Sequence, residues 1–139
     1  MPIALQVLAT AQALEKAAQR TFKPLGLTPA QFNVLNLLAA QPAGVRASDL
    51  ARALIVDRSN VTGLLKRMKK DGLLREVPTA HDRRQRVVAL SPKGRASWGA
   101  ANPAFEKGLV ACDAAIGAAD RKLAVQTLQR LAAIAAALP

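Results

Sequence analysis

Residues 46–94, RASDLARALIVDRSNVTGLLKRMKKDGLLREVPTAHDRRQRVVALSPKG, decide the fold of this chain. They begin with a short helix expected over about 48–54, followed by a tight connection. A strongly basic helix should then start after Asp57, a good N-cap residue, and end before Gly72, which suits the left-handed conformation that closes a helix. We therefore expect two helices joined by a turn, the second of them cationic.

A hairpin is expected after the basic helix. Two β-compatible runs, 74–78 and 86–90, flank the polar loop 79–84, which is too long for a tight turn and should project from the protein. Ser91 and Pro92 come next, in the order of cap and proline that opens a helix. The stretch thus predicts helix, turn, basic helix and hairpin, and then the start of a further helix.

Two helices are expected before this stretch. Apolar residues at helical spacing predict the first, which has about 20 residues and ends near Pro24: Ile3, Val7, Leu14, Ala18 and Phe22. Thr28 as N-cap and Pro29 at the first helical position open the second, which should end before Pro42. Its buried face should carry Phe32, Leu35 and Leu38.

Two helices are also expected after the hairpin. The first has an apolar stripe of Trp98, Phe105, Leu109, Cys112 and Ile116. Asn102 and Pro103 interrupt this helix and should kink it. The place of Cys112 on the stripe predicts a buried structural thiol rather than a redox switch. A last helix over about 119–138 has a stripe of Ala124, Leu128, Leu131, Ala135 and Leu138.

The terminal helices carry more apolar surface than the small central unit of helices can cover. The economical solution is that they pair with the same helices of a second copy, and the alternative is that they fold back within one monomer. A chain of 139 residues fits a single domain. Within it we expect a central unit at about 28–95 and dimerisation helices at about 1–25 and 92–139.

The charge is concentrated in the central unit. The net charge is +11, and residues 41–95 hold 13 Lys or Arg against 5 Asp or Glu. A merely solvated surface has no need of such a concentration, so a polyanionic partner is indicated. Few aromatic residues are available for base stacking, which counts against single-stranded targets.

The composition also excludes several classes of protein. A single cysteine allows no internal disulfide framework and suits a reducing cytoplasm. The longest uncharged run, 24–45, is broken by prolines and glycines, so no membrane span is expected, and the uncharged start lacks the basic residues of a signal peptide. One histidine, one cysteine and nine scattered carboxylates provide no catalytic pair, metal cluster or cofactor site. We expect a cytoplasmic protein that is not an enzyme.

Several segments together resemble the multiple-antibiotic-resistance regulator (MarR) family, over nearly the whole chain. The most diagnostic is DRR at 82–84, placed six residues before LSPKG at 90–94, which is similar to the wing of that family. The others are LTPAQF at 27–32, DLA at 49–51, VT at 61–62 with Leu65, and KDGLLR at 70–75. The resemblance implies a mainly α-helical winged helix-turn-helix fold with a small β-hairpin wing and terminal dimerisation helices.

The basic helix then becomes the recognition helix, which lies in the major groove of DNA. The start of such a helix offers short polar side chains to base edges: Asn60 can pair with adenine, and the Thr62 methyl group can touch thymine. Gly63 either allows a close approach of the backbone to DNA or is a tolerated helix glycine. The expected contact residues are Arg58, Ser59, Asn60, Thr62, Gly63, Lys66 and Arg67.

The hairpin becomes the wing. Arg84 can enter a narrow minor groove, and Asp82 can hold its guanidinium in a planar ion pair. Arg83 and Arg86 should add contacts to phosphates. The alternative is a solvent-exposed hairpin with an ordinary surface ion pair.

The resemblance further implies a homodimer that binds a pseudo-palindromic operator in double-stranded DNA and represses transcription. Release by a small aromatic or anionic ligand and the absence of any ligand remain equal alternatives. Phe22, Phe32, Trp98 and Arg20 could border a ligand cleft, but core packing explains the aromatic residues equally well. The competing function is a basic winged-helix module that binds RNA, or that binds DNA without regard to sequence in the nucleoid.

Overall fold

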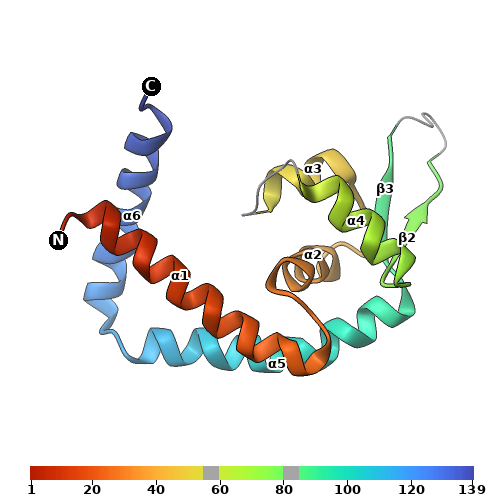
Figure 1. Ribbon diagram of the computed structural model, residues 1–139, viewed down its shortest axis with the longest axis horizontal. Helices are drawn as coiled ribbons and strands as arrows, with labels where there is room; N and C mark the ends of the chain where they lie inside the picture. Colours follow the sequence, from red (N-terminus) through yellow and green to blue (C-terminus); the bar gives the residue numbers. More distant parts are fainter. Residues whose placement is uncertain (55–59, 80–84) are drawn as a thin grey trace.

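The computed structural model describes residues 1–54, 60–79 and 85–139, and helices dominate it (Figure 1). The mainly α-helical fold with a small sheet is the one that the sequence predicts. In chain order the elements are α1 (Ile3–Phe22), the 3-10 helix η1 (Lys23–Leu25), α2 (Pro29–Ala39), β1 (Val45–Arg46), α3 (Ala47–Ala53), α4 (Val61–Lys70), β2 (Leu74–Val77), β3 (Val87–Leu90), α5 (Pro92–Ala114) and α6 (Ala118–Ala136).

The expected starts of α2 and α5 and the expected end of α4 are confirmed. The Thr28 hydroxyl accepts a hydrogen bond from the Gln31 N–H at 3.1 Å, and the Gln31 side chain accepts one from the Thr28 N–H at 2.9 Å. This reciprocal capping box satisfies amide groups that a helix start leaves unpaired. Ser91 Oγ accepts from the Gly94 N–H at the start of α5. Gly72 has a φ of 78°, the left-handed conformation expected after α4.

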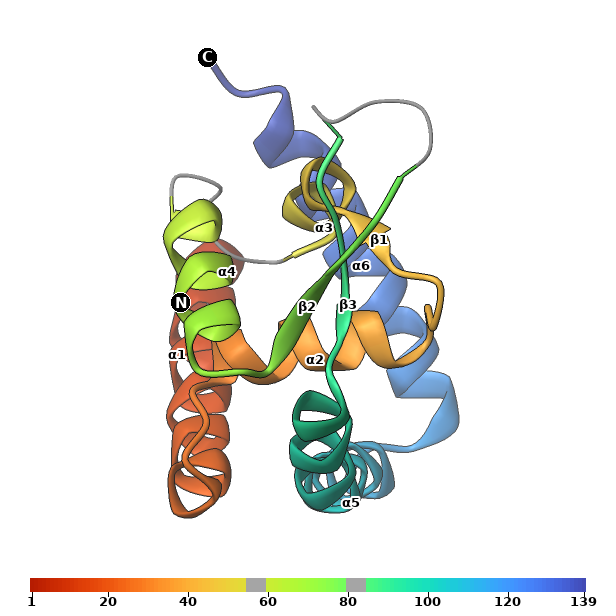
Figure 2. The same cartoon turned by 90° about the vertical axis from the view of Figure 1, so that its right-hand side faces the viewer.

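The sheet has three antiparallel strands in the order β1–β3–β2 (Figure 2). The hairpin pairs Leu74 with Leu90 and Val77 with Val87, so the two β-compatible runs pair as expected. The strand β1 was not expected. Its Arg46 pairs with Val87 on the other edge of β3, which joins the start of α3 to the base of the hairpin.

The core forms around α2. The largest fully buried side chains are Phe32, Val34, Leu35, Leu38, Leu50 and Met68, which come from α2, α3 and α4. Phe22 of α1 stacks on Phe32 with ring centroids 4.4 Å apart, and Phe105 of α5 lies 4.8 Å from Phe32. These rings fix α1 and α5 to α2, so the terminal helices leave the core from a defined junction.

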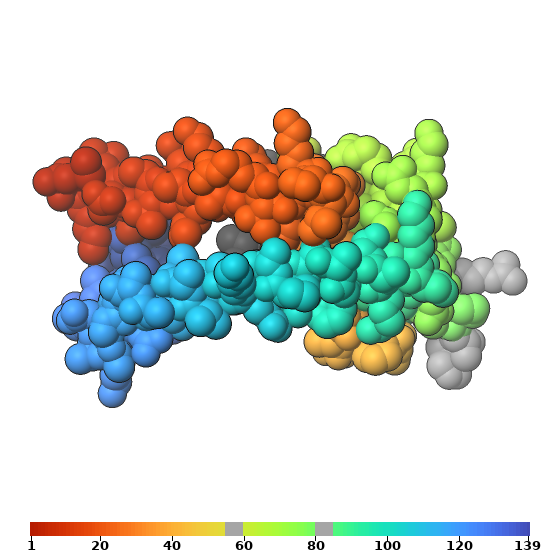
Figure 3. All heavy atoms as spheres, turned by 90° about the horizontal axis from the view of Figure 1, so that it is seen from below, coloured from red at the N-terminus to blue at the C-terminus, as the bar shows by residue number. Residues whose placement is uncertain are grey.

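Beyond that junction the terminal helices extend away from the core, with α1 and α5 running along the length of the molecule (Figures 1 and 3). Their apolar side chains are exposed to an unusual degree. Leu8 of α1 is 61% exposed and Leu123 of α6 is 63% exposed. The other large apolar residues exposed on these helices include Ile3, Leu5, Leu14, Leu109, Val110, Val125, Leu128 and Ile134.

Two expectations were wrong. The helix α4 begins at Val61 with Asn60 at its N-cap, later than expected, because the apolar residues that hold it to the core begin at Val61. Asp57 itself lies outside the described residues. Cys112 is exposed rather than buried, because the core covers the stripe of α5 only as far as Phe105. Pro103, where an interruption was expected, lies inside α5, which continues to Ala114.

Candidate nucleic-acid interface

The helix α4 has two opposite faces. One face packs into the core through Val61, Leu64, Leu65 and Met68. The other is exposed and carries Lys66, Arg67, Lys69 and Lys70, as the sequence predicts. Lys69 Nζ lies 2.7 Å from a carboxylate oxygen of Glu76 on β2, which offsets part of its charge. Lys69 is therefore less available to an outside anion than Lys66 and Arg67.

The start of α4 presents short polar side chains to solvent. Asn60 occupies the N-cap position, yet its side chain makes no capping hydrogen bond, and both Asn60 and Thr62 are exposed. The nearest atom to a Cβ built on Gly63 is Arg67 Nη1 at 3.5 Å, an ordinary contact. The described surroundings of Gly63 therefore leave room for a Cβ.

The wing is described at its base only. Arg86 is exposed immediately before β3, and the Ala47 N–H donates to its carbonyl oxygen at 2.8 Å. On β2, Arg75 Nε donates to the Leu90 carbonyl oxygen at 3.2 Å, which ties the two strands of the hairpin together. The other predicted contact residues, Arg58, Ser59, Asp82, Arg83 and Arg84, lie outside the described residues.

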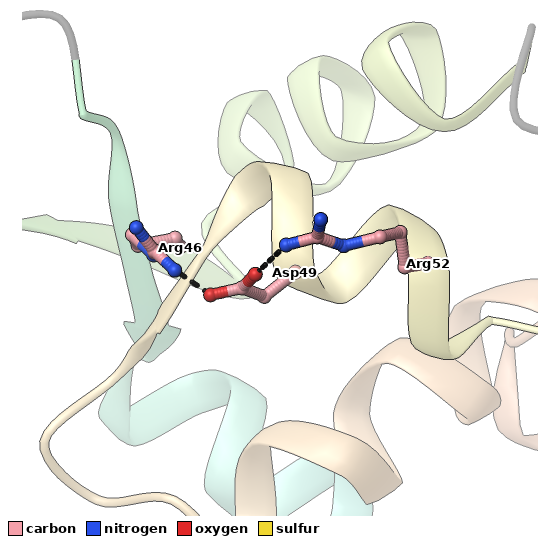
Figure 4. Close-up of polar contacts among 3 residues, drawn as sticks. All are labelled: Arg46, Asp49 and Arg52. Atoms are coloured by element: carbon pink, nitrogen blue, oxygen red, sulfur yellow. Dashed lines mark hydrogen bonds and ion pairs between the residues drawn. The ribbon is translucent and has the colours of Figure 1, made fainter.

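A cluster that sequence reasoning missed lies where β1 meets the start of α3 (Figure 4). Arg46 Nε donates to Asp49 Oδ2 at 2.7 Å, and Arg52 Nη2 donates to the other carboxylate oxygen, Asp49 Oδ1. We call these three residues the Arg46–Asp49–Arg52 cluster. Its signal in the sequence is a spacing of three residues between oppositely charged side chains, which places Asp49 and Arg52 on one side of a helix. Arg46 joins them from β1, immediately before the helix.

Both carboxylates near the basic surface are held in their charged form. The hydrogen bond from Arg46, followed by that from Arg52, lowers the pKa of Asp49 below its ordinary value. The hydrogen bond from Lys69 does the same for the pKa of Glu76. Because a lowered pKa keeps a carboxylate ionised to lower pH, both ion pairs persist throughout the neutral range.

The aromatic residues considered for a ligand cleft are part of the core. Phe22 is 2% exposed and Phe32 is fully buried within the ring cluster. Trp98 of α5 is partly buried, and its Nε1–H donates to Asn36 Oδ1 of α2 at 3.1 Å. Arg20 is exposed. These contacts favour core packing, the second of the two alternatives left open by the sequence.

A separate groove of about 520 Å³ lies between α1 and α6. Its walls are mainly apolar and include Val7 and Leu14 of α1 and Leu123 and Leu128 of α6. Asp120 is its one acidic wall residue. The groove therefore continues the exposed apolar surface of the terminal helices.

Other kinds of site were sought in the part of the chain that the structure describes. Within those residues, no three His, Cys, Asp or Glu side chains lie close enough to hold a metal ion. No helix there has the length and apolar character required to cross a membrane.

The fold and its charged surface define a class of protein. A helix-turn-helix made of α3 and α4, followed by the β2–β3 hairpin, is a winged helix-turn-helix. The model of the MarR family matches residues 25–85. The homoprotocatechuate degradative operon repressor of Escherichia coli is 32% identical over 104 residues, which are 72% of this chain and 69% of the repressor. The chain belongs to the MarR family of winged helix-turn-helix transcriptional regulators.

Two further relatives extend the comparison. The transcriptional activatory protein BadR of Rhodopseudomonas palustris is 41% identical over 90 residues, 63% of this chain, and the chain spans about half (51%) of the length of BadR. The transcriptional regulator MOSR of M. tuberculosis, solved in complex with DNA, is 29% identical with a TM-score of 0.77. That match covers 99% of this chain and 100% of the solved one. The fold therefore extends to the terminal helices in a relative crystallised on DNA.

Proposed function

We propose that this protein is a homodimeric transcriptional regulator that binds a pseudo-palindromic operator in double-stranded DNA and carries out no catalysis. The observation that carries the proposal is the exposed face of α4, where polar residues at the helix start precede a row of cations. This is the order of side chains that a recognition helix needs, since bases are read at its start and phosphates are met along its side. Its proposed place of action is the cytoplasm.

Each residue predicted to contact DNA has a role in this proposal. Asn60 and Thr62 face base edges in the major groove, and Lys66 and Arg67 meet phosphates. In the wing, Asp82 orients Arg84 toward a minor groove, and Arg83 and Arg86 add backbone contacts. Arg58, Ser59 and Gly63 are the remaining residues proposed to contact DNA beside Asn60 and Thr62. The DNA-binding unit spans about 28–95, and the helices at about 1–25 and 92–139 serve dimerisation.

The exposed apolar surface of the terminal helices is the reason for proposing a homodimer. The groove between α1 and α6 and the exposed leucines beside it form an apolar surface that a monomer leaves in water. Exposed apolar patches of this kind mark interfaces in soluble proteins. A partner with the same surface covers it by two-fold symmetry, and the same symmetry gives two recognition helices for the two halves of a palindrome.

Regulation by a small aromatic acid is a further part of the proposal. The Escherichia coli relative is named as the repressor of a homoprotocatechuate degradative operon, and homoprotocatechuate is an aromatic acid. Repression is the proposed output, because a dimer bound near a promoter blocks polymerase. The test adds aromatic acids to the DNA complex, and release at millimolar or lower concentration supports ligand control.

The function is tested by fluorescence anisotropy with duplex DNA from the region upstream of the gene. We expect binding at least about 1000-fold tighter than to a scrambled duplex of the same length at the same salt concentration. Equal affinity for both duplexes, or tighter binding to RNA, would favour the alternative of a sequence-blind nucleic-acid-binding module.

Replacing Lys66 with alanine should weaken binding and make it less dependent on salt. Each phosphate contact that is lost reduces the slope of log K against log salt by about 0.9, so we expect a reduction of about one per half-site. The loss should be the same for specific and scrambled duplexes, because phosphates carry no sequence information. Lys107→Ala removes the same charge from α5 and serves as the control. A slope equal to that of the control would remove Lys66 from the interface.

Replacing Arg84 with alanine should weaken operator binding by about 1–3 kcal/mol at fixed salt, because the wing loses its minor-groove contact. The effect should depend on sequence and be largest where the operator has an A·T-rich minor groove. Arg130→Ala is the control, because it removes the same charge from α6, outside the proposed DNA-binding unit. It should leave operator affinity unchanged. Equal affinities for Arg84→Ala and Arg130→Ala would exclude the wing from the mechanism.

A further inference from the structure

The Arg46–Asp49–Arg52 cluster has a place in the fold that the recognition helix and the wing do not explain. Arg46 lies in β1, beside the strand β3 of the wing, while Asp49 and Arg52 lie on α3 (Figure 4). Both arginines hydrogen-bond to one carboxylate, each to a different oxygen. The side chains of Arg46 and Arg52 are nevertheless 48% and 61% exposed.

Stability gives a poor account of this arrangement. Ion pairs between exposed side chains contribute little, because water screens them and ordering the side chains costs entropy. Arg46 also occupies the N-cap of α3, where a cation is unfavourable and no side-chain hydrogen bond caps the helix. Two arginines held around one aspartate therefore have a net charge of +1 that the fold does not require.

The geometry leaves both guanidinium groups able to bind a second anion. Arg46 uses its Nε for Asp49, and Arg52 uses one Nη. The remaining N–H groups belong to side chains that are about half exposed. A guanidinium fixed on one side by a carboxylate can offer its other edge to a phosphate in a planar, bidentate manner.

The position of α3 indicates which kind of anion the two arginines meet. In a helix-turn-helix bound to DNA, the first helix crosses the sugar–phosphate backbone while the second lies in the groove. Here the first helix is α3 and the second is α4. The Ala47 N–H also donates to the carbonyl oxygen of Arg86 at the base of the wing, so the cluster is joined directly to the other proposed DNA-binding element.

We propose that Asp49 is a positioning residue that holds Arg46 and Arg52 as a clamp on a backbone phosphate of the bound DNA. This inference rests on the proposed function, since it requires that the protein bind duplex DNA. It adds to the interface a contact at the start of α3, beside the base of the wing. The clamp contributes affinity and register but no sequence preference.

The test measures affinity for the upstream duplex and for a scrambled duplex over a series of salt concentrations, with the full-length protein. Arg52→Gln removes a cation of the clamp. The control is Arg121→Gln, which removes a cation from the exposed ion pair that Arg121 of α6 forms with Asp113 of α5. We expect Arg52→Gln to weaken binding to both duplexes by about the same factor, 3- to 10-fold, and to lower the salt slope by about one per half-site. Arg121→Gln should change neither. Arg46→Gln should behave as Arg52→Gln does.

The decisive variant is Asp49→Asn. It raises the net charge of the protein, so a role limited to long-range electrostatics predicts tighter binding to DNA. A positioning role predicts the opposite, because both arginines lose the carboxylate that aims them. We expect affinity to fall about 3-fold or more, and Asp49→Glu to recover part of it. Thermal unfolding of each free variant, compared with wild type, separates lost binding from lost folding.

Tighter binding by Asp49→Asn, or a salt slope of Arg52→Gln and Arg46→Gln equal to that of wild type, would overturn the clamp. Neither result affects the proposed function, provided that the wild-type protein still prefers its own upstream duplex. If the wild-type protein shows no such preference, the proposed function fails by itself. The salt slopes of the variants on scrambled DNA still report whether the clamp meets a phosphate.

Discussion

Replacing Leu128 with glutamate should convert the protein from a dimer to a monomer. Leu128 lies on α6, lines the groove facing α1, and is 46% exposed in the isolated chain. In the proposed dimer this groove is covered by the partner, so a carboxylate there would be removed from water without a counter-charge, in a groove whose wall already carries Asp120. Because the interface is two-fold symmetric, every dimer carries the change twice.

The size of the effect on dimer dissociation can be estimated from the lost leucine contact and the unpaired charge. Loss of a buried leucine contact costs about 1.5–3 kcal/mol, and the unpaired charge adds to it. A total of about 3 kcal/mol or more per dimer raises the dissociation constant more than about 100-fold. Sedimentation equilibrium at micromolar concentration should then show a monomer. Operator affinity should fall by a similar factor, since a monomer reaches only one half-site.

Gln129→Glu is the matched control, because it adds the same charge to the next residue of α6 outside the walls of the groove. It should remain a dimer. The proposed interface is wrong if Leu128→Glu still sediments as a dimer with wild-type operator affinity. If both variants dissociate, the cause is the charge of the helix and not the groove.

The helices were predictable because their signals are local. The cap at Thr28, the glycine at 72 and the apolar spacing of α2 and α4 each act within one or two turns of the chain, and each is found where the sequence places it. The cationic face of α4 was predictable for the same reason. A helix with its apolar residues on one side must present the others to solvent.

The features that the sequence did not predict depend on distant contacts. The strand β1 has two residues and exists because Val45 and Arg46 reach the free edge of β3, more than forty residues later in the chain. The orientation of Arg46 toward Asp49 follows from that pairing. The prediction that Cys112 is buried was wrong for a related reason. Its helical stripe is clear in the sequence, but how far the core reaches along α5 is set by Phe22 and Phe32.

Gly94 is a further case in which a distant contact could not be predicted. The sequence shows a glycine early in a helix, but it does not show which residue packs against that glycine in the fold. A Cβ built on Gly94 would lie 2.0 Å from the carbonyl oxygen of Leu73 and 3.0 Å from its carbonyl carbon. Backbone atoms cannot move aside as a flexible side chain can. The same carbonyl oxygen accepts a hydrogen bond from the Ser91 N–H at 3.1 Å, which fixes the start of α5 against the turn after α4.

Gly94→Ala should therefore destabilise the protein by about 3 kcal/mol, as expected for overpacking against a rigid neighbour. The first turn of α5 must move away from Leu73, and the hydrogen bond from Ser91 is strained or lost. For a chain of this size the change corresponds to a fall of about 10 °C in the unfolding temperature. Scanning calorimetry at a fixed protomer concentration measures it, because the stability of a dimer depends on concentration.

Gly99→Ala makes the identical chemical change five residues further along α5 and serves as the control. Gly99 is exposed, and a Cβ there meets no atom within 4 Å. Alanine should stabilise this helical position by about 0.5–1 kcal/mol, because it restricts the unfolded chain and favours the helix. The two variants should thus shift the unfolding temperature in opposite directions. If Gly94→Ala unfolds at or above the wild-type temperature, the close approach of α5 to Leu73 does not hold the helix-turn-helix to the dimerisation helices.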